Sequence, residues 1–201
     1  MKYTKKYLRA LTQPLIGIDE VGRGCLAGPV YAAAVIFNSE IDNHLYQDSK
    51  KLKETQRFEL AASVRQHHHY AIGIATVEEV DRVNIRQATF LAMRRAVEGL
   101  KIKDQSGTLL VDGRDIIPNL EGFKQLAIVQ GDDLVRLIAA ASIVAKVARD
   151  QFMSELARSH KDYGFEKHKG YGTEFHREQI QKFGPTVWHR QTFAGVKEYL
   201  P

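Results

Sequence analysis

Five short stretches of the chain are rich in apolar and β-branched residues and are bounded by turn-forming residues, a pattern typical of β-strands. The predicted strands are Leu15–Val21, Val30–Phe37, Tyr70–Val77, Thr108–Asp112 and Gln125–Gln130. The first two have no long helix between them, whereas helical stretches separate several of the later ones. This arrangement favours a mixed sheet over a purely parallel one.

Three other stretches place apolar residues three or four positions apart, which is the spacing of one face of an α-helix. The predicted helices are Glu54–His67, Val83–Leu100 and Leu134–His160. Together with the strands they predict an α/β fold, in which helices flank a mixed five-stranded sheet.

The chain has 201 residues, of which 44% are hydrophobic and 26% charged. These values are typical of a globular domain and exclude a disordered chain or a coiled coil. With no internal repeat and no linker, we expect a single domain over residues 1–201, with a core at about 14–158. Residues from about 159 to 201 are rich in Gly, His, Lys and aromatic residues, and we expect them to form a substrate-binding C-terminal segment.

The lone cysteine, Cys25, cannot form an internal disulfide, and no apolar run is long enough to span a bilayer. We therefore expect a cytoplasmic protein without membrane contact. The chain has 29 Lys and Arg against 24 Asp and Glu, a formal charge of +5. This balance favours a polyanionic partner such as nucleic acid.

Acidic residues stand at three predicted strand ends: Asp19 and Glu20, then Asp112, then Asp132 with Asp133. Neighbouring strands of one sheet can bring such carboxylates together, and oxygen ligands suit hard divalent cations. The alternative is that these acids cap turns and helices, with Asp132 or Asp133 capping the helix that begins near Leu134. Because adjacent strand residues point to opposite faces, we expect the strand to end or bulge at Asp19–Glu20, or a backbone oxygen to contribute.

The segment Gly22-x-Gly24-x-x-Ala27 matches a relaxed dinucleotide-binding pattern, which would make the protein an oxidoreductase. That pattern requires a helix after the glycines, but here Pro29 leads into a second predicted strand. The glycines instead suit close approach of a ligand to the backbone, and Arg23 between them can meet a phosphate.

Ser142, Lys146 and Arg149 lie at i, i+4 and i+7 on one predicted helix and form a polar stripe. The run Lys50, Lys51 and Lys53 is a second basic group. Each can contact phosphates of a nucleic acid, and each can alternatively be a solvated surface.

The opening segment Asp19-Glu20-Val21-Gly22-Arg23-Gly24-x-Leu26-Ala27-Gly28-Pro29-Val30 resembles the first motif of the type 2 ribonucleases H, the ribonuclease HII family. The resemblance extends over nearly the whole chain. Its further motifs are Asp48-Ser49-Lys50-Lys51-Leu52, Val83-Asn84-Ile85, Val111-Asp112-Gly113, Gly131-Asp132, Ala141-Ser142-Ile143-Val144-Ala145-Lys146-Val147 and Tyr163-Gly164-Phe165-x-x-His168-Lys169-Gly170-Tyr171. It implies an RNase H-like core with a helical C-terminal extension, and cleavage of RNA in RNA–DNA hybrids and of single ribonucleotides within duplex DNA, leaving 3′-hydroxyl and 5′-phosphate ends.

The resemblance also implies roles for individual residues. Asp19, Glu20, Asp112 and Asp132 resemble the catalytic, metal-binding acids, with Mn²⁺ or Mg²⁺ as cofactor and two ions in the catalytic complex. Asp19 would bridge both ions, Glu20 and Asp112 would complete one site, and Asp132 the other. Gly22, Arg23 and Gly24 resemble the ribose-sensing loop, and Tyr171 the junction-sensing tyrosine. The expected substrate-binding set is Gly22, Arg23, Gly24, Lys50, Ser142, Lys146, Lys169 and Tyr171.

The chain departs from the commonest family pattern at Arg114, Gln130 and Ala139, where Asn, Lys and Ser are usual. None of these positions is one of the four acids. Two other classes of function stay open at this point: a non-catalytic nucleic-acid-binding module and, less favoured, a dinucleotide-binding oxidoreductase. We expect the protein to be a monomer.

Overall fold

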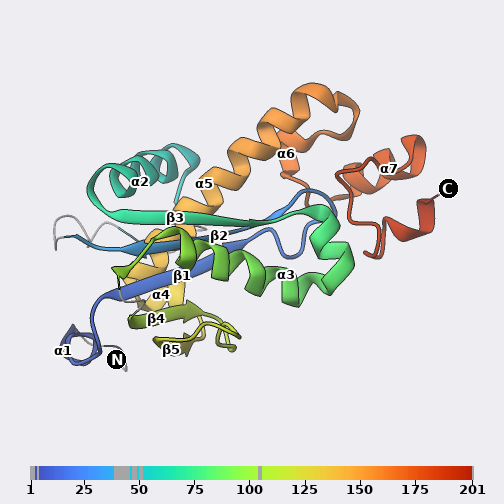
Figure 1. Cartoon of the computed structure of the whole chain (residues 1–201). Helices are drawn as coiled ribbons and strands as arrows, with labels where there is room; N and C mark the ends of the chain where they lie inside the picture. Colours follow the sequence, from blue (N-terminus) through green and yellow to red (C-terminus); the bar gives the residue numbers. More distant parts are fainter. Residues whose placement is uncertain are drawn as a thin grey trace.

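The computed structural model describes residues 3, 5–38, 46, 49, 52–103 and 106–200. Its centre is a five-stranded sheet in the order β3-β2-β1-β4-β5 (Figure 1). The strands are β1 (Leu15–Val21), β2 (Val30–Ile36), β3 (His69–Ala75), β4 (Gly107–Asp112) and β5 (Phe123–Ile128). β1 pairs antiparallel with β2 and parallel with β4, so the predicted mixed sheet is confirmed.

Some helices cover the two faces of the sheet, and others form a group near the C-terminus. They are α1 (Lys5–Arg9), α2 (Glu54–His67), α3 (Val77–Gly99), α4 (Gly131–Leu134), α5 (Arg136–Ser159), α6 (Phe165–His168) and α7 (Glu174–Phe183), with the 3₁₀ turns η4 (Lys161–Tyr163) and η5 (Lys197–Tyr199). None of the helices in the described ranges is both long and apolar enough to cross a membrane.

The start of α3 differs from the sequence prediction, which placed a strand as far as Val77 and a helix from Val83. Thr76 caps α3: its hydroxyl accepts a hydrogen bond from the Glu79 N–H, and the Glu79 carboxylate accepts one from the Thr76 N–H. A kink at Asn84, with φ of 68°, then divides the helix near the predicted start.

The predicted helix from Leu134 is also divided. α4 is a single turn, Val135 is extended with φ of −131°, and α5 begins at Arg136. The expected capping role of Asp132 or Asp133 is wrong, because both lie within the first turn of α4. The residues at the two N-cap positions, Gln130 and Val135, make no side-chain capping hydrogen bond.

Two hydrophobic cores lie on opposite faces of the sheet. α5 packs on one face, and a Cβ atom added at Gly17 of β1 would lie 2.3 Å from the Leu137 backbone, so only glycine permits this close crossing. α3 packs on the other face, where Ile16 and Ile18 of β1 contribute to the core. Side chains of β1 therefore alternate between the α5 face and the α3 face.

The segment after α5 packs at one end of the sheet and confirms the predicted helical C-terminal extension (Figure 1). Phe165, Ile180 and Val196 form a third core with the end of α5 and with Leu26 and Ala27 of the loop between β1 and β2. The extension thus rests directly on the glycine-rich loop, whose conformation depends on it.

Candidate active site

The predicted acids of β1 and β4 meet where β4 stops. β4 pairs with β1 only as far as Ile18 opposite Val111, whereas β1 continues to pair with β2 as far as Val21. Beyond Ile18, β4 no longer covers this edge of β1. Carboxylate oxygens of Asp19, Glu20 and Asp112 lie there within 4.8 Å of one another.

β1 continues to Val21 in regular pairing with β2, so the expectation that the strand ends or bulges at these acids is wrong. A contribution from a backbone oxygen stays a prediction. Asp19 lies on the α5 side, where it faces Ser142, and Glu20 lies on the α3 side, where Phe90 and Met93 are its neighbours. The regular alternation of the pleat is kept. The two carboxylates approach each other around the uncovered edge of β1, because β4 is too short to separate them.

The cluster of Asp19, Glu20 and Asp112 is electrostatically strained. Burial raises the pKa of Asp19 well above its usual value, and the charges of Glu20 and Asp112 raise it further, against opposing hydrogen bonds from Ser142 and the Glu20 N–H. Burial also raises the pKa of Glu20, partly offset by Arg23. A divalent cation relieves such repulsion, and the donors here are the carboxylate oxygens that hard cations prefer. The residues present therefore fit a Mg²⁺ or Mn²⁺ site.

Asp132 is buried in α4 but does not belong to this group within the described part of the chain. It is connected to the group through its neighbour, because the Gly131 N–H donates a 2.6 Å hydrogen bond to Asp112 Oδ1. Three of the four predicted acids are thus brought together, and the role of Asp132 as a ligand stays a prediction.

A cavity of about 290 Å³ opens beside the acids and contains most of the predicted substrate-binding residues. Its lining is Asp19, Glu20, Val21, Gly22, Arg23, Gly24, Ser49, Arg57, Asp112, Ser142, Lys146 and Tyr171. Lys50 lies outside the described residues. Lys169 does not line the cavity, because its ammonium group donates to Ser154 Oγ at 2.6 Å and to the Glu166 carbonyl at 2.8 Å.

Sequence reasoning missed Ser49 and Arg57 as cavity residues. The Ser49 hydroxyl lies 3.0 Å from that of Ser142, and Arg57 donates to the carbonyls of Ser49 and Leu52. Ser49 belongs to a motif that carried the family resemblance, so its position could have been anticipated. Arg57 looks like any other charged residue of an amphipathic helix.

The polar stripe on α5 is only partly a cavity surface. Ser142 and Lys146 reach the cavity, and Lys146 Nζ lies 2.8 Å from Asp150 Oδ1 and 6.0 Å from the centre of the Tyr171 ring. The interpretation of Arg149 as a phosphate contact is wrong. Its fully buried guanidinium donates to the carbonyls of Ala27, Pro29 and Lys169, because the loop and the C-terminal segment cover this end of the stripe.

The glycine-rich loop is held by a second buried arginine, Arg190, which sequence reasoning missed. Arg190 donates to the carbonyls of Gly22 at 2.6 Å, Arg23 at 2.8 Å and Gly28 at 2.8 Å. Gly22 has φ of 96°, and a Cβ atom there would lie 2.2 Å from Arg149 Nε. The loop conformation thus depends on this glycine and on two guanidinium groups beneath the loop.

Buried histidines hold the backbone of Tyr171. His189 Nδ1 accepts from the Thr186 N–H, so its Nε2 carries the proton and donates to His176 Nε2 at 3.1 Å. His176 Nδ1 then donates to the Tyr171 carbonyl at 2.9 Å. Burial lowers the pKa of His176 to about 4 and that of His189 to about 3, so this chain of hydrogen bonds is neutral near pH 7.

The dinucleotide-binding interpretation is excluded by the fold. The glycines lead into β2, which pairs antiparallel with β1, and no helix opens at the turn.

Comparisons with known proteins agree with the site. A sequence model of the family described as ribonuclease HII matches residues 16–196. Ribonuclease HII of Pelagibacter ubique is 44% identical over 186 residues, which cover 92% of this chain and 98% of the relative. Ribonuclease HII of Fusobacterium nucleatum is 50% identical over 185 residues, covering 89% and 85%.

Among solved structures, the ribonuclease HII in the PCNA:RNase HII complex from Archaeoglobus fulgidus superimposes with a TM-score of 0.77. It is 27% identical in sequence, and the match covers 90% of this chain and 96% of that one. The fold, the three acids and the relatives agree, which removes the non-catalytic alternative. The chain therefore belongs to the ribonuclease HII family and is a divalent-metal-dependent endoribonuclease that cleaves the RNA of RNA–DNA hybrids.

Proposed function

We propose that this enzyme also cleaves duplex DNA at a single embedded ribonucleotide and leaves 3′-hydroxyl and 5′-phosphate ends. The observation that supports this proposal most is the cluster of Asp19, Glu20 and Asp112 at the edge of a cavity that also contains the Gly22–Gly24 loop and Tyr171. The acids that would bind cations thus lie next to the loop and the tyrosine that would contact the sugar.

Two divalent ions, Mn²⁺ or Mg²⁺, are proposed to bind here, with Asp19 shared by both, Glu20 and Asp112 completing one site and Asp132 the other. Such ions stabilise the negative charge that develops on phosphoryl and leaving oxygens, and they acidify water. Burial and, after it, the neighbouring carboxylates raise the pKa values of Asp19 and Glu20, and bound cations would favour the charged carboxylates.

The other cavity residues are proposed to select and position the substrate. Backbone groups of Gly22, Arg23 and Gly24 would contact the 2′-hydroxyl, the group by which RNA is distinguished from DNA. Lys146 and Ser142 would bind phosphate on the α5 side. Tyr171, 41% exposed, would stack on the sugar or base beside the cleaved linkage.

Residues from about 159 to 201 are proposed to form the substrate-binding segment of one continuous domain, since they carry Tyr171 and support the loop. We also propose that the enzyme acts as a monomer. Nucleic-acid substrates and a lone cysteine also support the proposal that the enzyme works in the cytoplasm.

The test is cleavage of duplex DNA with one ribonucleotide, with and without Mg²⁺ or Mn²⁺, followed by mapping of the product ends. We expect metal-dependent cuts at the ribonucleotide. Asp19→Asn should lower kcat by at least about a thousandfold, because it removes a cation ligand while preserving shape and the basic surface. Binding of the duplex should change little.

Cleavage without divalent metal, or full activity of Asp19→Asn in Mg²⁺, would contradict the assignment. Cleavage of a continuous RNA–DNA hybrid but not of the single-ribonucleotide duplex would contradict only the proposed substrate range.

A further inference from the structure

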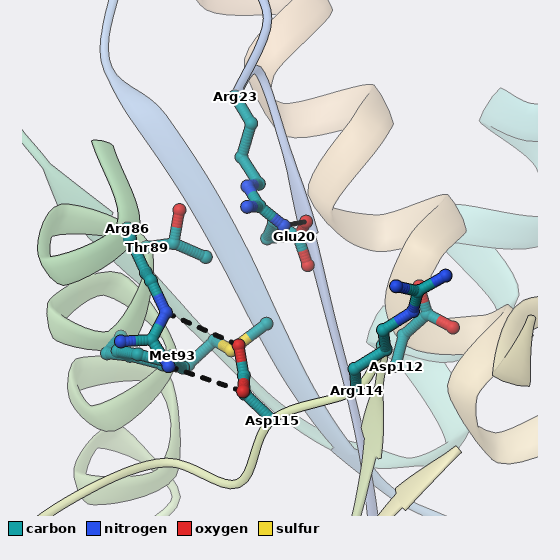
Figure 2. A pocket seen from close by; sticks show the side chains of 10 residues that line it. Glu20, Arg23, Arg86, Thr89, Met93, Asp112, Arg114 and Asp115 are labelled. Atoms are coloured by element: carbon teal, nitrogen blue, oxygen red, sulfur yellow. Dashed lines mark hydrogen bonds and ion pairs between the residues drawn. The ribbon is translucent and has the colours of Figure 1, made fainter. Parts of the chain in front are cut away.

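A second, smaller hollow of about 40 Å³ lies on the α3 side of the acids (Figure 2). It shares Glu20, Arg23 and Asp112 with the main cavity, so the two spaces meet at the acids. Its outer wall carries Arg86 from α3 and Arg114 from the turn after β4. On the opposite face of the sheet, the main cavity is lined by two other basic residues, Lys146 of α5 and Arg57 of α2.

Arg86 is oriented by Phe90 and Asp115. Its guanidinium lies 5.0 Å from the centre of the Phe90 ring. It contacts both oxygens of the Asp115 carboxylate, with Nη2 3.2 Å from Oδ1 and Nε donating to Oδ2 at 3.4 Å (Figure 2). Because the Arg86 and Asp115 side chains are 57% and 53% exposed, solvent screens this pair, and a phosphate can compete with Asp115 for the guanidinium.

Arg114 is exposed, and among the described residues no hydrogen bond or ion pair engages its side chain. It follows Gly113, whose φ of 111° turns the chain away from β4. Arg114 and Asp112 both line the hollow (Figure 2). The hollow therefore contains a cation as well as a predicted metal ligand.

The charge of the hollow depends on the cations that the acids bind. Three guanidinium groups, of Arg23, Arg86 and Arg114, face three carboxylates, of Glu20, Asp112 and Asp115. Once divalent cations neutralise Glu20 and Asp112, this rim is strongly positive. Arginine suits phosphate oxygens because its planar fork can donate two parallel hydrogen bonds.

We propose that Arg114 and Arg86 bind a non-scissile backbone phosphate of the cleaved strand on the α3 side of the acids. This inference rests on the proposed function. A strand whose scissile phosphate lies at the acids continues on both sides of them. The hollow shares its acids with the cavity, so the phosphate that reaches it belongs to a nearby linkage of the same strand. The strand would then cross the end of the sheet from Lys146 to Arg114.

The first experiment measures kcat/KM for the single-ribonucleotide duplex in Mg²⁺ at several salt concentrations. Arg114→Ala should lower kcat/KM about tenfold at low salt and reduce the magnitude of the salt slope by about 0.9, as for one lost phosphate contact. Arg86→Ala should lose about threefold, because Asp115 competes for that guanidinium.

Arg82→Ala is the matched control. Arg82 lies on the same helix, has a 71% exposed side chain and does not line the hollow. We expect its kcat/KM to stay within about twofold of the unmodified enzyme. If Arg114→Ala behaves like Arg82→Ala, the proposal is overturned.

The second experiment identifies the strand by replacing single non-scissile phosphates with uncharged methylphosphonates. At one position in the cleaved strand, the methylphosphonate should lower the activity of the unmodified enzyme. The same replacement should not lower the activity of Arg114→Ala any further, as in a double-mutant cycle. If Arg114→Ala is coupled only to phosphates of the complementary strand, the assignment of Arg114 to the cleaved strand is overturned. Failure of the unmodified enzyme to cleave would overturn the proposed function as well, whereas normal cleavage with an unaffected Arg114→Ala overturns this inference alone.

Discussion

The acid cluster at the end of the sheet and the C-terminal segment that supports the glycine loop are built in opposite ways. In the cluster, three carboxyl groups lie close together, and burial together with the charges of Glu20 and Asp112 raises the pKa of Asp19. In the C-terminal segment, Arg190 and the histidines are buried and hydrogen-bonded to backbone carbonyls or to each other. The first region carries the chemistry, and the second fixes the positions of the groups that contact the substrate.

The two regions should respond differently to mutation. Removing a charge from the acid cluster should lower activity without destabilising the fold. Removing a supporting side chain from the C-terminal segment should leave buried carbonyls without donors and destabilise the fold.

The largest expected loss of stability is for Arg190→Ala. Its guanidinium satisfies the carbonyls of Gly22, Arg23 and Gly28, so we expect a loss of about 3–5 kcal/mol in the free energy of unfolding, measured by urea denaturation. Arg177→Ala is the matched control. That exposed arginine makes a 3.1 Å hydrogen bond to the Gly172 carbonyl, and its removal should cost less than about 1 kcal/mol. Equal losses would show that burial of the guanidinium does not determine how much stability an arginine contributes here.

Tyr171 belongs to both regions, because its backbone is held by His176 and its ring lies in the cavity. Tyr171→Ala should lower kcat/KM on the single-ribonucleotide duplex by about fivefold to a hundredfold, the value of a stacking contact of about 1–3 kcal/mol. Tyr171→Phe should keep most activity. Equal losses of Tyr171→Ala on this duplex and on a continuous hybrid would contradict junction sensing and leave a general contact.

Lys146→Ala should have the smallest effect. We expect weaker binding to all duplexes and a salt slope reduced in magnitude by about one unit, with no change in sequence preference. The Asp150 carboxylate, 2.8 Å from Lys146 Nζ, would lose its partner. The double variant Asp150→Asn with Lys146→Ala therefore controls for the unpaired negative charge of Asp150. A slope that does not change in a titration of affinity against salt would return Lys146 to a structural role.

The sequence was informative where each functional residue stands out in its own strand. Asp19 and Asp112 are carboxylates at the ends of apolar runs, a placement that is costly without a ligand, and the structure brings them together. The ends of β1 at Val21 and of β4 at Asp112 were both predicted, but the sequence could not supply their register, in which Ile18 pairs with Val111. This register leaves the end of β1 beyond β4 and allows Asp19 and Glu20 to meet without a bulge.

Features that depend on distant partners were not predicted. Arg149 fits the helical spacing of the polar stripe, but the loop and the C-terminal segment bury it. Arg190 contacts carbonyls more than 160 residues away in the sequence, and no local pattern signals such a contact. The start of α3 was missed because the apolar periodicity from Val83 is clearer than the capping box at Thr76 and Glu79.

The most direct test of the account is the melting temperature of the metal-free protein and of Asp19→Asn, each with and without Mn²⁺. The folded-state pKa of Asp19 is raised above its unfolded value, so its ionisation lowers stability as pH rises from the unfolded to the folded pKa. Above that window, metal-free Asp19→Asn should therefore melt at a higher temperature than the metal-free unmodified protein. Mn²⁺ should raise the melting temperature of the unmodified protein and have much less effect on the variant. Equal Mn²⁺ shifts, or a less stable variant, would contradict a cation site built on Asp19.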